Sequence, residues 1–487
     1  MLPVLLAGLL ALLAYFYLSA WRSKRTLPPG PTPWPIIGNL HQIDKVAPYN
    51  TFIQLGEKYG GVYTLYFGWK PVVFLYGYDT LKDALLGQAE DFSGRGIVPV
   101  FERIARRKGV VFSNGPHWFH QRKFALTTLK NFGMGKRSIE ERVAEEAMFL
   151  VEFFKSKNGK PFNPGPEMTA AVSNAICSIV FGERFDTQDE TFQTLHRMLL
   201  ENLTFLGRRG FQLYNAFPEI LRWLPGDHNK IFQNGTMLQT YLRGLIDNHI
   251  LTRDPNCPRD FVDSFLNRME EEEGSPDSHF TLESLTMTTF NLFIAGTGTT
   301  ASTLRWLLKF MLEYPEIQKK AQAEVDKVIG TEVCPSLEHR VSLPYTDAVI
   351  HEVQRFSSVV PNGLPHAALK DIKFKGYIIP KDTQIVTMLH SALFDKKYWD
   401  KPEEFNPERF LDENGKFVKN DALIPFGAGK RACIGESLAK TELFIFFVSF
   451  LQKFNLKFPP GEKGPIGLVP GGTRDPQPFN MCAELRS

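Results

Sequence analysis

The 487-residue sequence predicts a mainly α-helical protein with several small β-sheets. Several segments carry apolar residues at helical spacing, and the longest, residues 281–314, would span roughly 50 Å as one helix. Aromatic and β-branched residues typical of strands gather near residues 62–76, at 372–389 and at the carboxyl end. No internal repeat is visible, so we expect one large fold behind an amino-terminal extension.

This extension divides into an apolar segment and a connector. Residues 1–21 carry no charged side chain, which is about the length that a membrane-spanning helix needs, and a basic stretch at 22–25 follows directly. By the positive-inside rule we expect an uncleaved single-pass anchor over 1–21, with a cleaved signal peptide as the alternative. Residues 22–36 are a basic, proline-rich hinge, and residues 37–487 form the cytosolic domain.

The remaining elements follow in order along the chain. A β-hairpin is expected at residues 62–76, because the sequence Gly-Trp-Lys-Pro at 68–71 interrupts the strand pattern. The long helix should end at Pro315. Residues 372–389 should be extended around a turn at 380–382. Further helices are expected at residues 140–154, 168–180, 192–206 and 230–250, and from near Pro344.

Charge and cysteine usage exclude two classes of protein. The net charge is only +3 and no long basic run occurs, which argues against a nucleic-acid partner. The five cysteines are few, odd in number and widely spaced, which indicates a reducing compartment and no disulfide framework. They are Cys177, Cys257, Cys334, Cys433 and Cys482.

The chemically informative stretch is residues 426–435, Phe-Gly-Ala-Gly-Lys-Arg-Ala-Cys-Ile-Gly. Its glycines at 427, 429 and 435 allow a tight turn and close approach of the backbone to a flat ring. Cys433 precedes a helix-prone run, and a helix N-terminus and nearby cations would lower the pKa of its thiol. A lone cysteine of this kind is also compatible with a buried structural role.

The complete pattern F-x-x-G-x-R-x-C-x-G, from Phe426 to Gly435, resembles the haem-binding loop of the cytochromes P-450. The resemblance runs from the anchor to the carboxyl end, and its details are similar to the microsomal group that oxidises drugs, fatty acids and steroids. It implies the P-450 fold, haem b as cofactor and Cys433 as the axial thiolate ligand of the haem iron, which favours cleavage of the O–O bond.

A second motif lies in the long helix, where residues 295–300 read Ala-Gly-Thr-Gly-Thr-Thr. It resembles the oxygen-activation motif of the family, which implies that Thr299 donates a hydrogen bond to oxygen, with Gly298 and Thr300 beside it. The family usually carries an acid where this chain has Gly298. Water replaces that carboxylate, or coupling is poor, or the enzyme rearranges peroxides and needs no proton relay. A purely structural reading is close helix packing through Gly296 and Gly298.

Two further sets of residues match positions of the family. The two haem propionates need cationic or N–H donors in a buried pocket. An E-x-x-R pair places both charges on one helix face, and with a second arginine it resembles the family's structural Glu-Arg-Arg network; a solvated surface pair is the alternative. The cofactor-binding set is Arg95, Trp118, Arg122, His366, Phe426, Arg431 and Cys433, and the network is Glu352, Arg355 and Arg409.

Residues that line the substrate site can be assigned only by their position in the family. Almost all are apolar, which predicts a lipophilic substrate held by shape. The expected set is Val98, Phe101, Phe290, Phe293, Ala295, Val359, Leu364 and Phe479, with Leu203, Leu206 and Val360 as neighbours. Trp223 and Leu224 are expected to dip into the membrane.

The resemblance implies a membrane-anchored haem-thiolate monooxygenase of the endoplasmic reticulum. No G-x-G-x-x-G fingerprint follows a strand, so NADPH must act through a separate NADPH-cytochrome P-450 reductase, with a microsomal b-type cytochrome as a further candidate partner. The alternatives are a peroxide-rearranging isomerase that needs no reductase and a non-enzymatic haem or sterol carrier. A docking face, or a merely solvated one, is expected at Lys123, Lys130, Lys136, Arg137 and Lys430.

Overall fold

The computed structural model describes Gly8 and residues 26–44, 47–132, 137–464, 467–469 and 471–486. The expected anchor at 1–21, apart from Gly8, and the first hinge residues therefore lie outside the described residues. Within the described ranges, no helix combines the length and the hydropathy that crossing a bilayer requires.

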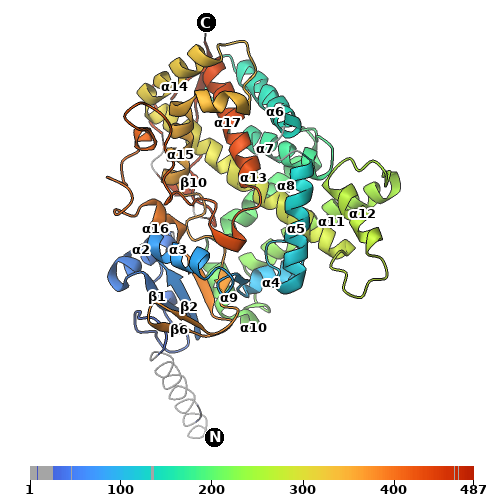
Figure 1. The fold of residues 1–487 in the computed structure, drawn as a ribbon, viewed down its shortest axis with the longest axis vertical. Helices are drawn as coiled ribbons and strands as arrows, with labels where there is room; N and C mark the ends of the chain where they lie inside the picture. Colours follow the sequence, from blue (N-terminus) through green and yellow to red (C-terminus); the bar gives the residue numbers. More distant parts are fainter. Residues whose placement is uncertain are drawn as a thin grey trace.

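The fold is built around α13 (Leu282–Glu313), which confirms the predicted long helix. Its amino end is capped by Thr281, whose side chain accepts a hydrogen bond from the Ser284 amide at 3.2 Å. Its carboxyl end lies before Pro315, which cannot continue the helical hydrogen bonds and begins the next helix, α14. Figure 1 shows α13 crossing the molecule, with α7, α17 and α15 beside it.

The other helices make up most of the rest of the fold. The predicted segments at 140–154, 168–180, 192–206 and 230–250 fall within α6, α7, α8 and α11, and α15 begins at Pro344. The bounds are α2 (Pro48–Tyr59), α3 (Tyr78–Lys82), α4 (Pro99–Ala105), α5 (Gly115–Asn131), α6 (Arg137–Ser156), α7 (Gly165–Val180), α8 (Glu190–Leu206), α9 (Arg209–Ala216), α10 (Pro218–Leu221), α11 (Asp227–Thr252), α12 (Phe261–Glu271), α14 (Pro315–Val328), α15 (Pro344–Ser357), α16 (Leu389–Leu393) and α17 (Glu436–Lys453).

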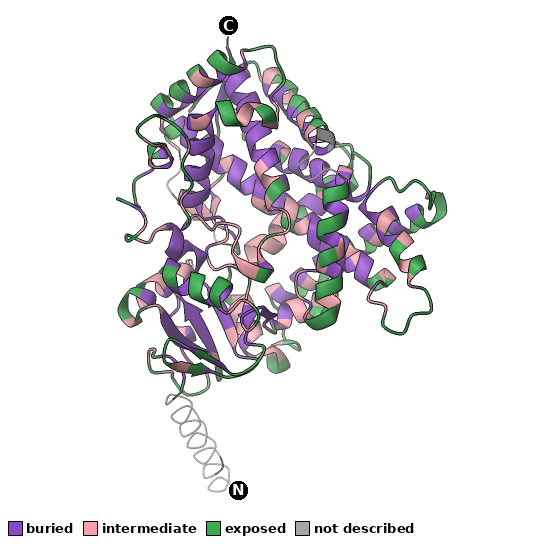
Figure 2. Cartoon of the chain, viewed as in Figure 1, coloured by how far each residue is buried: buried purple, intermediate pink, exposed green. Residues whose placement is uncertain are grey.

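The main core lies where these helices meet. Figure 2 shows that α7, most of α13 and the later turns of α17 are buried. In α17 every residue from 441 to 451 is buried, with Phe444, Phe446 and Phe447 fully so, and this part of the helix therefore has packing partners on all sides. A helix buried on every side has fixed neighbours, and the segment that precedes it is thereby held in place.

The largest sheet brings distant segments together beside the helices. Strands β1 (Val62–Phe67) and β2 (Lys70–Leu75) form the predicted antiparallel hairpin. The strand order is β1-β2-β7-β4-β3, where β7 is Gln384–Thr387, β4 is His366–Ala367 and β3 is Gly94–Arg95. The β3–β4 pairing sets Arg95 directly opposite His366.

Residues 372–389 are extended on either side of the predicted turn, which falls at 381–382, but they also contain a hairpin turn and the start of a helix that the prediction lacked. Strands β5 (Ile372–Phe374) and β6 (Tyr377–Ile379) form a separate hairpin, and a helix rather than a strand begins at Leu389. The hairpin turns at Lys375 and Gly376, which both have positive φ angles, of 47° and 85°. Near the carboxyl end, β8 (Phe454–Lys457) pairs with β11 (Cys482–Leu485), and β9 (Leu468–Val469) with β10 (Asp475–Pro476).

Candidate active site

The loop before α17 owes its shape to two glycines. Gly427 and Gly429 have φ angles of 73° and 71°, a region that favours glycine. A Cβ atom on Gly429 would also lie 2.0 Å from the backbone oxygen of Leu85. Gly435 has an ordinary φ of −94°, so the turn does not depend on it. The Cys433 amide then donates to the Phe426 carbonyl at 3.0 Å, which holds the cysteine at the start of α17.

Cys433 opens into an internal cavity of about 440 Å³ between α13, α17 and the loops that follow α3 and α15. The Cys433 residue is solvent-accessible, and it lines this cavity. Burial raises the pKa of the thiol, although the Gly435 amide and Arg122 act to lower it. This corrects the expectation of a lowered pKa. The surrounding protein alone does not favour the thiolate, whereas a bound metal cation would.

Three arginines, Arg95, Arg122 and Arg431, line the same cavity. No carboxylate lies within ion-pair distance of any of them among the described residues. They are held by backbone carbonyl groups instead: Arg95 donates to Val111 at 3.1 Å, Arg122 to Ala432 at 2.6 Å, and Arg431 to Ser93 at 2.7 Å and Ser113 at 2.8 Å.

This cluster of positive charge lacks an anion. Burial and the repulsion of the neighbouring arginines lower the pKa of Arg95 to about 9 and that of Arg431 to about 8. Burying cations without a counter-charge is costly, and bidentate carboxylates are the anions that guanidinium groups bind best. A flat group carrying two carboxylates, as haem does, fits this donor set.

Of the buried nitrogen atoms without a hydrogen-bond partner among the described residues, two belong to side chains at this cavity. They are Nε1 of Trp118 and Nη1 of Arg431. The Arg431 guanidinium lies over the Trp118 ring at 3.8 Å from its centroid, so the two side chains hold each other in place. Unsatisfied buried donors beside unpaired arginines again fit an anionic cofactor. Phe426 also lines the cavity.

His366 lines the cavity, but its ring is in a tautomer that cannot donate a hydrogen bond to a group bound there. Its Nδ1 atom lies 2.7 Å from the Phe92 carbonyl and must therefore carry the hydrogen. Burial, with Arg95 nearby, lowers the pKa of His366 to about 3, so the ring is neutral and Nε2 is an acceptor. His366 can donate to a propionate only once it is protonated.

The residues of the second motif face the cavity from α13. The Thr299 hydroxyl donates to the Ala295 carbonyl within the helix, at 2.8 Å. Gly298 is buried, and a Cβ atom there would lie 2.7 Å from Cδ1 of Leu203 on α8. A side chain at position 298 would therefore require the end of the Leu203 side chain to move. Thr300 is buried and lines the cavity as well.

The expected substrate-lining set is brought together only in part. Five of its members line the cavity: Phe101, Phe290, Ala295, Val359 and Leu364. Val98, Phe293 and Phe479 do not, and this is a correction. Phe293 and Phe479 pack in the main core, and Val98 is a buried residue that precedes α4. The Phe293 side chain is used for packing against the core instead, although residues on either side of it along α13 line the cavity.

Sequence reasoning missed several polar residues of the cavity. Asn202, Asn291 and Glu442 line it. Asn291 accepts a hydrogen bond from the Val111 amide at 3.2 Å, which fixes the loop after α4. The sequence shows only that a single polar residue interrupts an otherwise apolar helical face. It does not show which residues of other elements lie beside that polar residue.

Glu352, Arg355 and Arg409 meet in a buried network outside the cavity. The Arg355 guanidinium binds both carboxylate oxygens of Glu352, at 2.7 and 2.8 Å, and Nε of Arg409 binds one of them at 3.1 Å. Glu352 and Arg355 are fully buried. The other donors of Arg355 reach the carbonyl groups of Leu393 and Pro402. The network thus ties α15 to the segment that leads toward the cysteine loop.

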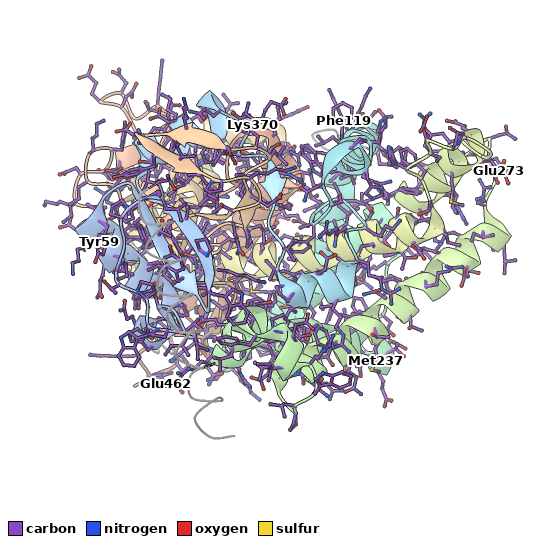
Figure 3. The ribbon with its side chains drawn as sticks, turned by 90° about the horizontal axis from the view of Figure 1, so that it is seen from below. Tyr59, Phe119, Met237, Glu273, Lys370 and Glu462 are labelled. Carbon is purple, nitrogen blue, oxygen red and sulfur yellow. The ribbon has the colours of Figure 1, made fainter. Side chains whose placement is uncertain are left out.

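The expected basic face is described only in part. Lys123 and Lys130 are exposed on α5, on the side where Phe119 also projects outward, as Figure 3 shows for Phe119. Lys430 forms an ion pair with Glu90. Lys136 and the side chain of Arg137 lie outside the described residues.

These features define the class of protein. Residues 28–483 match the sequence model of the family described as Cytochrome P450. The chain belongs to the cytochrome P450 family, whose members are haem b monooxygenases. Membership of this family of enzymes excludes the alternative of a non-enzymatic haem or sterol carrier.

Individual relatives cover nearly the whole chain. It is 47% identical to Cytochrome P450 2H2 of Gallus gallus over 99% of this chain and 98% of that protein. It is 49% identical to Cytochrome P450 2C20 of Macaca fascicularis over 90% of each chain. It is 45% identical to Cytochrome P450 2B2 of Rattus norvegicus over 98% of this chain and 99% of that protein.

Proposed function

We propose that this chain is a membrane-anchored haem-thiolate monooxygenase that inserts one oxygen atom of dioxygen into a neutral, lipophilic substrate. In this proposal Cys433 is the axial ligand, and Arg95, Trp118, Arg122 and Arg431 bind the propionates. The observation that carries it is a single cavity that joins the cysteine, three unpaired arginines and an apolar wall. When bound, haem supplies the oxygen chemistry, and the chain positions the substrate and moves protons.

The charge of the cavity supports neutral substrates. Its charged residues are the three arginines and Glu442, and the rest of the wall is mostly apolar. Once the arginines bind propionates, no cation among the described lining residues remains for a substrate carboxylate. Steroids and neutral drug-like molecules should therefore be oxidised in preference to fatty acids, since burying an unpaired carboxylate is costly.

The electrons would come from NADPH through a separate reductase, because the sequence has no dinucleotide-binding fingerprint of its own. The exposed Lys123 and Lys130 on α5 support docking of an acidic partner on the side of the molecule where Trp118 and Arg122 reach the cavity. A b-type cytochrome would use the same charge complementarity. The apolar residues 1–21 support an anchor in the endoplasmic reticulum membrane, with residues 37–487 as the cytosolic catalytic domain.

The test is turnover by the purified full chain in lipid vesicles, with and without NADPH and NADPH-cytochrome P-450 reductase. We expect product only when both are present, and faster oxidation of a steroid than of a fatty acid of similar size. A second candidate function is the rearrangement of organic peroxides, because the chain has glycine and no acid at position 298. Conversion of an organic hydroperoxide without NADPH, together with no NADPH-driven product, would establish the rearrangement instead.

A further inference from the structure

A second hollow lies at the surface, where α5 meets the loop between α12 and α13. It measures about 590 Å³, and none of its lining residues belongs to the cavity of Cys433. Histidine and acidic side chains make up most of its wall, a composition that suits a metal cation and not an apolar ligand. These side chains are His120, Glu271, Glu272, Asp277 and His279.

Three histidine rings gather at this hollow. His117 and His120 are three residues apart on α5 and therefore lie on one face of that helix. His279 comes from the loop before α13, and its ring centre lies 5.7 Å from that of His117 and 4.9 Å from that of His120. Because His279 is far from the other two in the sequence, no motif spacing reveals this group.

The backbone that carries the three rings is held in place from within the protein. The Gln121 amide group donates to the His279 carbonyl at 2.8 Å, and its oxygen accepts from the Thr288 hydroxyl at 3.2 Å. One turn after His120 on α5, Phe124 packs against Phe265 of α12, with ring centres 5.3 Å apart. Binding at this site therefore needs little ordering of the backbone, which lowers its entropy cost.

The state of His117 suits a metal ligand. Its Nε2 atom is buried and has no hydrogen-bond partner among the described residues, and a buried polar atom of this kind calls for one. Burial, with Lys108 and His279 nearby, lowers the pKa of His117 to about 4. The ring is therefore neutral at pH 7, which is the form that binds a metal ion.

Carboxylates around the rings make the hollow favourable to a cation. Glu271 and Glu272 share the Arg268 guanidinium, at 2.9 and 2.7 Å, so one positive charge faces two negative charges. Asp277 is exposed and lines the same hollow. An excess of negative charge in a concave site raises the local concentration of cations.

We propose that His117, His120 and His279 bind one divalent transition-metal cation of the Zn²⁺ type. An oxygen of Asp277 or of water would complete the tetrahedron. Two imidazoles on one tetrahedral Zn²⁺ have ring centres about 5 Å apart, because each Zn–N bond is about 2.0–2.1 Å long. The separations of 4.9 and 5.7 Å are close to this value.

Binding requires the three rings to turn. Their nitrogen atoms are not all within 4.8 Å of one another in this structure. His120 is exposed, and His117 and His279 are partly so, which leaves the rings room to rotate about their side-chain bonds. The bound cation would then fasten the loop before α13 to α5.

The first test is a calorimetric titration of the haem-loaded full chain, produced without a histidine tag, with Zn²⁺. We expect one zinc ion per chain. His120→Gln and His279→Gln should each weaken the affinity by at least about 10- to 100-fold, since loss of even a supporting group costs that much. His41→Gln is the matched control, because His41 also has a buried ring nitrogen without a partner but stacks on Trp34 outside the hollow.

X-ray absorption at the zinc edge then identifies the ligands without interference from the haem iron. The parent chain should show nitrogen and oxygen neighbours at about 2.0–2.1 Å, together with the multiple scattering of imidazole rings. This imidazole signal should decrease in His120→Gln and His279→Gln and stay unchanged in His41→Gln. Zinc should also raise the unfolding temperature of the parent chain more than that of the two variants, because it binds the folded state.

Three results would overturn the proposal. They are the absence of saturable zinc binding, zinc affinity in His120→Gln and His279→Gln equal to that of the parent chain, and sulfur neighbours at about 2.3 Å, which would place the ion on cysteines. If His279→Gln fails to fold, His120→Gln still decides the matter, because the His120 side chain is exposed.

Discussion

At the residue scale, the cysteine loop depends on two glycines with the same backbone conformation but different surroundings. Left-handed backbone costs a non-glycine residue about 1–2 kcal/mol. At Gly427 nothing lies within 4 Å of an added Cβ atom, whereas at Gly429 the Leu85 backbone oxygen would lie 2.0 Å away. The same substitution should therefore have unequal effects at the two positions.

We expect Gly427→Ala to lower the free energy of unfolding by about 1–2 kcal/mol. Gly429→Ala should lower it by about 3 kcal/mol or more and should weaken haem retention, because backbone must move as well. Thermal unfolding and the haem-to-protein ratio after gel filtration measure both effects. Equal losses in the two variants would mean that the contact with Leu85 does not shape the loop.

Single residues also show what the sequence could predict. Cys433, the three arginines and Trp118 were predicted from motif positions, and the structure places all of them at one cavity. Glu442 was missed, since the sequence of a mostly apolar helix does not show that its one buried glutamate lines the cavity. Phe293 was assigned to the cavity in error, because the rotation of α13 relative to its neighbours is set by packing.

At the scale of elements, α11 and α12 are joined by a buried histidine–aspartate pair. The ring nitrogens of His249 lie 2.8 Å from the Leu245 carbonyl and 2.8 Å from an Asp260 oxygen. Burial alone would lower the pKa of His249, but the hydrogen bond and charge of Asp260 raise it on balance. With two acceptors facing it, the ring carries both hydrogens and a positive charge. The Asp260 side chain also caps α12.

This pair predicts a pH-dependent stability. A raised folded-state pKa means that the contribution is fully present below the unfolded pKa of about 6.5 and is lost as the pH rises through the higher folded pKa. His249→Gln should cost about 3 kcal/mol at about pH 5.5, and the gap should narrow by about pH 9. Thermal unfolding temperatures of both proteins across this range provide the measurement. A gap that widens with pH would show that the histidine is neutral when folded.

Helix positions were predictable because apolar spacing reports which side of a helix is buried, as in α6, α7, α8 and α11. The hairpin β5–β6 was missed because its short strands, Ile372–Phe374 and Tyr377–Ile379, pair only with each other. Its turn at Lys375 and Gly376 gave a weaker signal than Pro380 in the same stretch. Short strands depend on partners that a local pattern does not identify.

At the scale of the whole molecule, exposed apolar side chains gather near the start of the described chain. Trp223 is 77% exposed, Ile220 63% and Trp34 58%. The rings of Trp69 and Phe217 lie 5.5 Å apart, which brings the hairpin turn next to the segment around α10. Figure 1 shows α10 and this sheet at the same end of the molecule. Such a patch is suited to a membrane surface.

If this patch enters the bilayer, lipids with brominated chains should quench the fluorescence of Trp223 in the full chain reconstituted in vesicles. Trp223→Phe should therefore lower the quenched fraction, because this ring would lie among the acyl chains. Trp399→Phe is the control, since Trp399 is 2% exposed and lies inside the protein. If the two variants were quenched alike, the patch would lie outside the membrane.

The most direct test of the whole account is the spectrum of the reduced carbonyl complex of the purified chain beside that of Cys433→Ser. The thiolate of Cys433 should give the parent chain the red-shifted Soret band that this ligand produces, because it donates electron density to the haem iron. The serine variant should lose that band together with NADPH-driven turnover. A serine variant that kept both would contradict the account.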